Sequence, residues 1–206
     1  MNPPSDYRTS TTAYYDTHAA EFCESTATVD MSGLYEPFLA EIPAGGLILD
    51  AGSGSGRDSQ AFLRMGYRVV AIDASVEMVK ATSKLTGLQA KLLTFDAIDF
   101  HDEFDGIWAC ASLLHIAQAD LASALAGLTG ALKPLGVLYM SFKHGATERL
   151  ENGRFFNDMD EPLLVTLIAN QPELEPVRLW ITEDVRNERR GSQQWINAIV
   201  RRRESL

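Results

Sequence analysis

The sequence is poor in cysteine and contains no long hydrophobic run. Its two cysteines, Cys23 and Cys110, lie far apart in the chain, a spacing that argues against a disulfide framework or a cysteine-based zinc site. No apolar run approaches the length needed to cross a bilayer, and the first residues show no basic start followed by an apolar block. We therefore expect a cytoplasmic protein with no membrane partner and no secretory signal.

Positive charge is also scarce. The chain carries 18 Lys and Arg against 28 Asp and Glu, a formal net charge of -10. A nucleic acid would have to bind against this overall field and is not an expected partner. The basic run 201–203 is interpreted as solubilising charge. A chain of 206 residues is long enough for one full core, and we expect a monomer or homodimer that acts on a small molecule.

What the chain does have is a regular alternation of apolar runs and helical patterns. Strands are expected at 46–51, 67–73, 90–94, 104–109 and 137–142, and helices at 57–65, 75–85 and 118–132. Such spacing implies right-handed crossovers and a parallel sheet with helices on both faces. We predict an α/β fold, with a Rossmann-like, doubly wound, mostly parallel seven-stranded sheet whose last strand is antiparallel.

Different patterns flank this alternation. The first 11 residues indicate a loose arm, and residues 144–158 indicate a long polar loop. The other expected elements are helices at 12–24, 32–41 and 160–170 and strands at 175–187 and 193–202. The last two strands resemble a hairpin, which makes the final strand antiparallel to its neighbours.

The most informative segment is an apolar strand that runs into an acid and three glycines. Residues 47–56 read Leu-Ile-Leu-Asp-Ala-Gly-Ser-Gly-Ser-Gly, and Asp73 closes the next strand. Glycine lets the backbone turn tightly and approach a ligand with no Cβ in the way, and an acid at the end of the second strand suits a ribose diol. The segment therefore predicts a cofactor that contains a nucleoside.

Together with four further segments, this pattern resembles the class I S-adenosylmethionine-dependent methyltransferases. The segments that carry the resemblance are 49–56, 71–75 with Met78, 95–97, 104–115 and 132–136. The chain looks most like the small-molecule enzymes of ubiquinone biosynthesis and tellurite resistance, and Tyr14-Tyr15-Asp16 matches the N-terminal lid of that group. One departure is Leu135, where the usual turn has Gly-Gly. The resemblance implies a single domain over 1–206, with lid helices in 1–42, a cofactor-binding core in 46–143, and a substrate loop, helix and hairpin in 144–206.

The resemblance also implies roles for individual residues toward S-adenosyl-L-methionine. Asp50 and the loop at 52–56 would meet the amino-acid part, and Asp73 would accept the ribose hydroxyls. Asp96 with Ala97 would contact the adenine edge. The full set implied to bind the cofactor is Asp50, Gly52, Ser53, Gly54, Gly56, Arg57, Asp73, Ala74, Met78, Asp96, Ala97, Cys110 and Ala111. Arg57 could instead be an ordinary residue of the first helical turn.

Methyl transfer from a sulfonium is an in-line displacement, which mainly requires alignment of the acceptor and exclusion of water. Ligands of open α/β sheets bind outside the carboxyl ends of the strands, and His115 follows the fourth strand there. We interpret it as the candidate base or substrate contact, titrating near physiological pH, although a packing role stays open.

The candidate acceptor contacts are Tyr14, His115, Lys143, Arg149 and Arg154. Arg149 and Arg154 would attract an anionic or oxyanion-bearing substrate, although a solvated loop with surface ion pairs is the alternative. An aromatic stripe such as that of Tyr14 is more often simply core. No cluster of metal ligands stands out.

Two other functions remain open at this point. A nicotinamide-dependent oxidoreductase would need Gly-x-Gly-x-x-Gly, but position 57 is Arg, and it would need a catalytic set that the chain lacks. A non-catalytic S-adenosylmethionine-binding regulatory protein would keep the same cofactor motifs. We expect an enzyme that transfers a methyl group to a small molecule.

Overall fold

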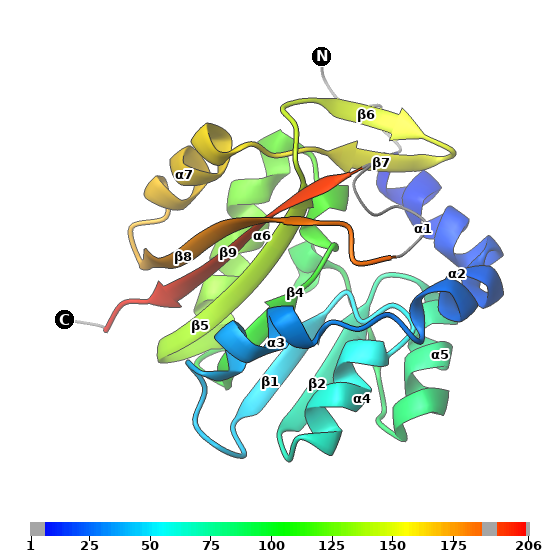
Figure 1. The fold of residues 1–206 in the computed structure, drawn as a ribbon, viewed down its shortest axis with the longest axis horizontal. Coiled ribbons are helices and arrows are strands. Elements are labelled where there is room, and N and C mark those ends of the chain that lie inside the picture. The colour runs from blue at the N-terminus through cyan, green and yellow to red at the C-terminus, as the bar shows by residue number, and fades with distance from the viewer. Residues whose placement is uncertain (1–6, 187–192, 205–206) are drawn as a thin grey trace.

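A seven-stranded sheet forms the centre of the protein in the computed structural model, which describes residues 7–186 and 193–204. The strand order is β3-β2-β1-β4-β5-β9-β8 (Figure 1). Its strands are β1 (Leu47–Ala51), β2 (Arg68–Asp73), β3 (Lys91–Leu92), β4 (Phe104–Ala109), β5 (Leu132–Lys143), β8 (Leu174–Glu183) and β9 (Gln194–Arg202). The strands β1 to β5 are parallel, whereas β9 runs antiparallel to both β5 and β8. The predicted fold class is confirmed.

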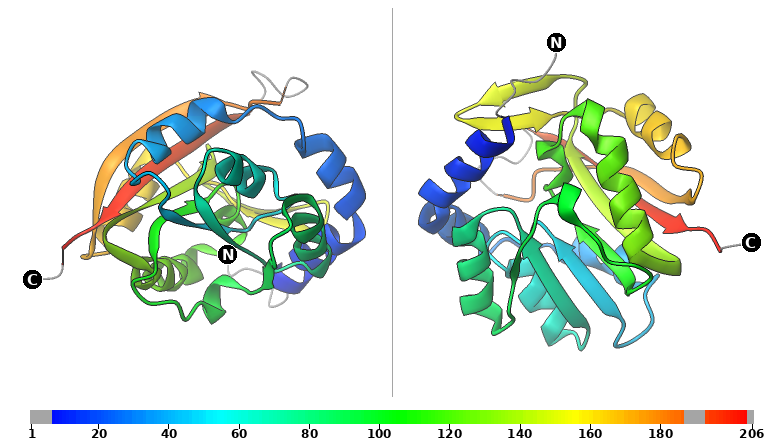
Figure 2. Two further views of the ribbon diagram at one scale, coloured as in Figure 1. Left: turned by 90° about the horizontal axis from the view of Figure 1, so that it is seen from below. Right: turned by 180° about the vertical axis from the view of Figure 1, so that it is seen from behind.

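Helices cover both faces of the sheet, as the crossovers require (Figure 2). The helices are α1 (Tyr7–Thr17), α2 (Ala19–Thr26), α3 (Ser32–Leu39), α4 (Arg57–Arg64), α5 (Val76–Thr86), α6 (Gln118–Ala131) and α7 (Glu161–Ala169). One face packs against α6 and α7 in a core that includes Leu49, Ile107 and Met140. The other face packs against α3 and α4, where Trp108 stacks on Tyr139 with ring centroids 3.9 Å apart.

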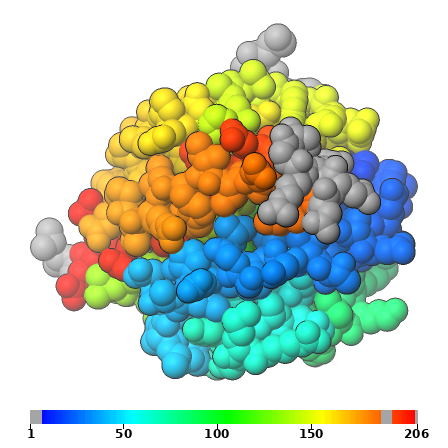
Figure 3. Space-filling model, viewed as in Figure 1, coloured from blue at the N-terminus to red at the C-terminus, as the bar shows by residue number. Residues whose placement is uncertain are grey.

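The helices α1 and α2 lie at the end of the sheet where β1, β2 and β4 finish (Figure 1). The helix α1 contacts both β7 and α5, so it joins the hairpin that follows β5 to the helix that follows β2. In the space-filling view, the N-terminal helices pack beside the C-terminal strands (Figure 3). Within the described ranges, no helix has both the length and the apolar character that a bilayer span needs.

Two expectations about the ends of the chain are wrong. Residues 7–11 are helical rather than part of a loose arm, because Tyr7 packs its ring 4.6 Å from Phe155 and donates a hydrogen bond to Asp120. The expected helix at 12–24 is two helices that meet at His18. Residues 1–6 and 187–192, which include the end of the expected strand at 175–187 and the turn after it, lie outside the described residues.

The expected polar loop at 144–158 is also wrong, because it contains a β-hairpin of β6 (Glu148–Glu151) and β7 (Arg154–Asn157). Asn152 and Gly153 form its turn with φ of 50° and 79°, and Asn-Gly is a strong signal for a turn with two positive φ values. The strand β5 starts at Leu132 rather than 137, so residues 133–136 lie in the strand rather than in the turn expected before it.

Candidate active site

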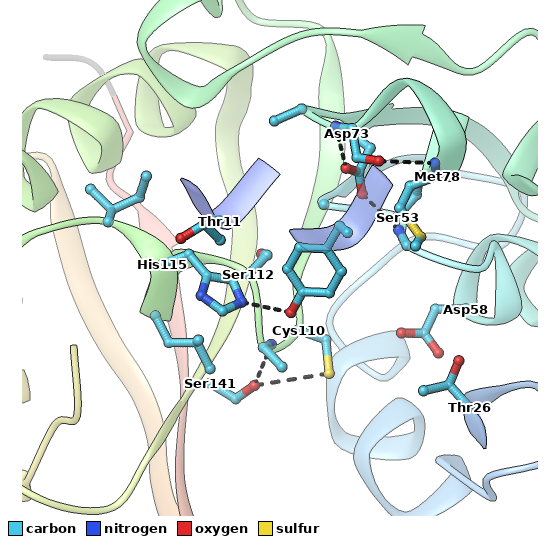
Figure 4. A pocket seen from close by; sticks show the side chains of 18 of the residues that line it. Thr11, Thr26, Ser53, Asp58, Asp73, Met78, Cys110, Ser112, His115 and Ser141 are labelled. Atoms are coloured by element: carbon cyan, nitrogen blue, oxygen red, sulfur yellow. Dashed lines mark hydrogen bonds between the residues drawn. The ribbon is translucent and has the colours of Figure 1, made fainter. Parts of the chain in front are cut away.

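A cavity of about 360 Å³ opens at the carboxyl ends of β1, β2, β4 and β5. This volume lies in the usual range for small-molecule sites. Most of the sequence-predicted residues line it (Figure 4). Those that do are Gly52, Ser53, Gly54, Arg57, Asp73, Ala74, Met78, Asp96, Cys110, Ala111, His115, Lys143 and Arg154. Asp50, Gly56, Ala97, Tyr14 and Arg149 do not line it.

The turn after β1 has a shape that only glycine accommodates. Gly52, Gly54 and Gly56 all have positive φ, at 88°, 53° and 81°. A Cβ on Gly52 would lie 2.4 Å from Cβ of Ser112, and one on Gly56 would lie 2.8 Å from Cα of Thr82. The missing Cβ atoms therefore let the turn pack closely against Ser112 and Thr82, and the backbone of Gly52 and Gly54 lines the cavity.

Asp73 is fixed by the backbone at the end of β2. Its Oδ2 accepts a hydrogen bond of 2.8 Å from the Gly54 N–H, and its Oδ1 accepts one of 2.9 Å from the Ser75 N–H. Burial raises the pKa of Asp73, while these N–H groups oppose the rise. Further hydrogen-bond donors, such as a pair of hydroxyl groups, would therefore stabilise the ionised carboxylate.

Asp50 lies behind the glycine turn rather than on the cavity wall. Its carboxylate is 2% exposed and accepts a hydrogen bond of 2.6 Å from the Ser59 hydroxyl. Burial, and then the charge of Asp58, raise the pKa of Asp50. Any effect of Asp50 on a ligand is therefore indirect, through Ser59 in the first turn of α4.

Arg57 is bound to its neighbour Asp58, whose carboxylate accepts hydrogen bonds from Arg57 Nε at 2.6 Å and Nη2 at 2.9 Å. Tyr35 and Trp108 donate to the same carboxylate at 2.5 and 2.9 Å. Burial would raise the pKa of Asp58, but Arg57 and these donors outweigh it and lower the pKa. The Arg57 guanidinium faces the cavity as one half of a buried ion pair.

Asp96 lies at the mouth of the cavity, with its side chain 61% exposed. Arg8 of α1 reaches it at 3.2 Å and also binds Asp120 at 2.9 Å. The carboxylate that sequence reasoning places at the adenine edge is thus joined to the N-terminal helix.

The segment after β4 forms the far wall. Ala111 has a φ of 51°, and its N–H donates to the Ser141 hydroxyl at 2.9 Å (Figure 4). Burial, and then the charge of Asp58, raise the pKa of the Cys110 thiol to about 12. Cys110 is therefore a neutral thiol at the wall and not a nucleophile.

His115 is held at both ring nitrogens. Nδ1 lies 2.6 Å from the Phe155 carbonyl, and Nε2 lies 2.9 Å from the Tyr15 hydroxyl. Burial, with smaller contributions from Arg154 and Lys143, lowers its pKa to about 4. The expectation that it titrates near physiological pH is wrong, because the buried imidazole is neutral there.

Three cations surround the ring of Phe156. Lys143 Nζ lies 3.8 Å from the ring centroid, and the guanidinium carbons of Arg149 and Arg154 lie at 4.7 and 5.1 Å. Arg149 pairs with Glu151 and Asp158 at 3.5 and 3.4 Å. Lys143 has Glu151 at 3.8 Å, whereas Nε of Arg154 is buried and has no hydrogen-bond partner among the described residues. Arg154 and Lys143 face the cavity, and Arg149 lies behind them.

Sequence reasoning missed a group of residues from the last two strands. Thr182, Asp184, Arg186, Trp195 and Asn197 line the cavity. Asp184 binds Arg186 and accepts a hydrogen bond from Trp195 Nε1 at 3.3 Å. These residues reach the site because β9 pairs with β5, a contact that no local pattern encodes. In the described part of the chain, no group of three or more His, Cys, Asp or Glu could hold a metal ion.

Comparisons with known proteins point to one family. Residues 48–136 match a family described as methyltransferase domain. A ubiquinone biosynthesis O-methyltransferase from Xanthomonas axonopodis pv. citri is 32% identical over 106 residues, which cover 48% of this chain and 44% of that protein. The match thus spans less than half the length of the curated relative.

Solved structures share the fold. A 1,6-didemethyltoxoflavin-N1-methyltransferase from Burkholderia thailandensis, solved with bound 1,6-didemethyltoxoflavin and S-adenosylhomocysteine, has a TM-score of 0.81 at 21% identity over 99% of this chain and 92% of that chain. A magnesium protoporphyrin IX methyltransferase from Synechocystis, solved with S-adenosylmethionine, has a TM-score of 0.74 at 14% identity over 98% and 100%. The sequence-based resemblance to methyltransferases is confirmed, because residues 48–136 match a methyltransferase domain and solved methyltransferases share the fold of the chain.

Proposed function

We propose that the protein transfers a methyl group from S-adenosyl-L-methionine to a small-molecule acceptor by in-line displacement. The observation that carries this proposal is the bare backbone of the turn after β1 facing Asp73, whose two oxygens are oriented by the Gly54 and Ser75 N–H groups. This arrangement lies within the segment that matches the methyltransferase family. The turn and the carboxylate fit a nucleoside bound close to the backbone.

The residues on the β1–β2 side would hold the cofactor, which supplies an electrophilic methyl group on a sulfonium when bound. Gly52, Ser53 and Gly54 would contact its amino-acid part, and Asp73 its ribose. Gly56 would act by holding the turn in shape, and Asp50 would act indirectly, through Ser59. The remaining residues proposed to line the cofactor are Arg57, Ala74, Met78, Asp96, Cys110 and Ala111, whereas Ala97 lies outside the cavity wall. Asp58 already accepts hydrogen bonds from Nε and Nη2 of Arg57, so only the rest of that guanidinium would contact the cofactor.

The acceptor would lie on the β5 side, beside Lys143 and Arg154. Two carboxylates, Glu151 and Asp158, accompany the three cations around Phe156. The unpartnered Nε of Arg154 supports an acceptor that carries an anionic or oxyanion group. Tyr14 would contribute through its ring, which packs 4.4 Å from the Arg154 guanidinium.

The proposal extends to the whole chain. We propose a single unit with a lid in 1–42, a cofactor-binding core in 46–143 and an acceptor side in 144–206. The free state of both cysteines supports a cytoplasmic location. We further propose a monomer or homodimer, which light scattering of the purified protein would measure.

Calorimetry and a transfer assay test the proposal together. We expect the protein to bind S-adenosylmethionine but not NAD, and Asp73→Ala to weaken that binding by about 1.5–3 kcal/mol, the range for a hydrogen bond to a charged group. Asp99→Ala is the control, because Asp99 is an exposed loop acid. Transfer of a labelled methyl group to a panel of phenols, amines and carboxylates then separates an enzyme from a binding protein. Tight binding of NAD, or unchanged affinity in Asp73→Ala, would contradict the assignment.

A further inference from the structure

The hydrogen bonds of His115 fix its tautomer. The Phe155 carbonyl can only accept, so Nδ1, at 2.6 Å, carries the proton. In a neutral ring Nε2 then has only a lone pair, and the Tyr15 hydroxyl, at 2.9 Å, donates to it. Both nitrogens are thus occupied within the protein, so His115 has no free polar atom for a methyl acceptor.

Tyr15 is in the opposite situation. Its proton points to His115, and one lone pair of its oxygen faces Arg154. The other lone pair remains available, and the side chain lines the cavity with Arg154 and Lys143. Tyr15 is held in place by Phe22, whose ring lies 5.2 Å away edge-on, and by His115 itself. The phenol oxygen therefore presents a fixed hydrogen-bond acceptor on the acceptor side of the site.

We propose that Tyr15, on the N-terminal helix, is the catalytic residue that takes the proton of the acceptor, and that His115 is a positioning residue that acts through it. This inference rests on the proposed function. As the acceptor atom bonds to the methyl carbon and the carbon–sulfur bond electrons return to sulfur, the acceptor proton passes to Tyr15 Oη. The original phenol proton passes to His115 Nε2, and the resulting imidazolium later releases it to water.

A weak base is sufficient for this path. A hydroxyl or amine becomes strongly acidic as a methyl group bonds to it, so a neutral His115 need not be a strong acceptor. Burial raises the pKa of Tyr15, and the charge of Arg154 opposes the rise. An anionic group on the acceptor would offset Arg154 and Lys143, the two cations that oppose a charge on His115.

The first test needs no turnover. In protein with ¹⁵N-labelled histidine and S-adenosylhomocysteine, we expect His115 as the Nδ1–H tautomer, with an Nε2 resonance that shifts in Tyr15→Phe. His115→Asn identifies the signal among the four histidines. An Nε2–H tautomer, or an Nε2 chemical shift that is the same in Tyr15→Phe as in the wild type, would overturn the inference.

The second test separates proton transfer from a structural role. The probes are 4-hydroxybenzoate and 4-mercaptobenzoate, which share a shape and a carboxylate, but the thiol ionises unaided near neutral pH. We expect Tyr15→Phe to lower kcat about 100-fold or more with the hydroxyl probe and to leave kcat with the thiol probe nearly unchanged. Tyr67→Phe, at the far end of β2, is the matched control.

Equal losses with both probes would show that Tyr15 only shapes the site and would overturn the inference. Calorimetry with S-adenosylmethionine checks that each variant still folds and binds. If the wild-type protein methylates neither probe, the proposed function loses support, while the tautomer measurement still decides the inference about Tyr15.

Discussion

Gly52 and Gly66 have nearly the same φ but differ in their surroundings. Their φ values are 88° and 89°, yet a Cβ on Gly52 would meet Ser112 whereas one on Gly66 would have no atom within 4 Å. Comparing the two positions therefore separates two reasons why a position requires glycine: a left-handed backbone, and a neighbouring atom too close to allow a Cβ.

We expect Gly66→Ala to cost about 1–2 kcal/mol of stability, the penalty for a left-handed residue with a Cβ. Gly52→Ala should cost a further 1–3 kcal/mol, roughly, because the added methyl overpacks the contact with Ser112. Urea denaturation of both variants measures the difference. Equal losses would mean that Ser112 moves aside freely.

The burial of Asp50 predicts that the free energy of unfolding rises as the pH falls. An ion-paired acid would have the opposite effect. Its pKa is raised in the folded state by burial and by Asp58, above an unfolded value of about 3.9. Ionised Asp50 therefore destabilises the fold at pH 8, and the cost is relieved as the pH falls through the folded pKa.

We expect Asp50→Asn, whose amide oxygen still accepts from Ser59, to raise the free energy of unfolding at pH 8 and to flatten its rise between pH 8 and pH 5. Denaturant titration at several pH values measures this, with Asp99→Asn as the exposed control. A variant that is less stable than the wild type at pH 8 would refute the explanation.

At the scale of elements, α1 is joined to the N-terminus of α5. Asp16 Oδ1 accepts hydrogen bonds from the Ser75 hydroxyl at 2.6 Å and from the Glu77 N–H at 3.2 Å. A carboxylate at a helix N-terminus satisfies an unpaired N–H and favours the helix dipole. This contact ties α1 to the segment that follows Asp73.

Asp16→Ala should therefore cost about 1 kcal/mol of stability and loosen α1 before the rest of the fold. Hydrogen exchange of the α1 amides is the direct measurement, and we expect faster exchange there with little change in α6. Glu21→Ala, an exposed residue of α2, is the control. Unchanged exchange in α1 would show that its aromatic contacts suffice to hold it.

For the whole molecule, a bound cofactor adds to stability by mass action. At a concentration of about 100 times Kd, it contributes about 2.7 kcal/mol, which corresponds to a rise in Tm of about 5–11 °C for a protein of this size. We expect this shift with S-adenosylmethionine and none with NAD. A scan of Asp73→Ala at the same concentrations should show a smaller shift.

The alternation of strands and helices could be predicted from the sequence because each element leaves a local signature. The glycines after β1, the acid after β2 and the Ser75 cap of α5 are all local patterns, and Ser75 does accept a hydrogen bond from the Met78 N–H. These patterns identified most of the residues that line the β1–β2 side of the cavity, where we propose the cofactor binds. The Asn152-Gly153 turn was equally local, and the hairpin it forms could have been predicted.

The remaining features depend on contacts between distant segments. Helix α1 begins at Tyr7 because of Asp120 and Phe155, and the Ser/Thr-rich sequence after it gives little helical signal. The placement of Asp184 and Asn197 in the cavity follows from the pairing of β9 with β5. His115 lines the cavity at the expected end of the sheet, but its partner Tyr15 lies 100 residues away, so its tautomer could not be predicted from the sequence.

The helix α1 contacts both sides of the cavity. It contacts the proposed cofactor side through Asp16 and Arg8. It contacts the proposed acceptor side through Tyr15 and Thr11. Ordering α1 costs conformational entropy. A compound that orders this helix when it binds therefore removes that cost for the second compound. Linkage makes such cooperation reciprocal, so the two reactants should heighten each other's affinity by one common factor. Paired titrations, each run with and without saturating S-adenosylhomocysteine or 4-hydroxybenzoate, measure that factor, and a value of one would mean that the helix is already rigid.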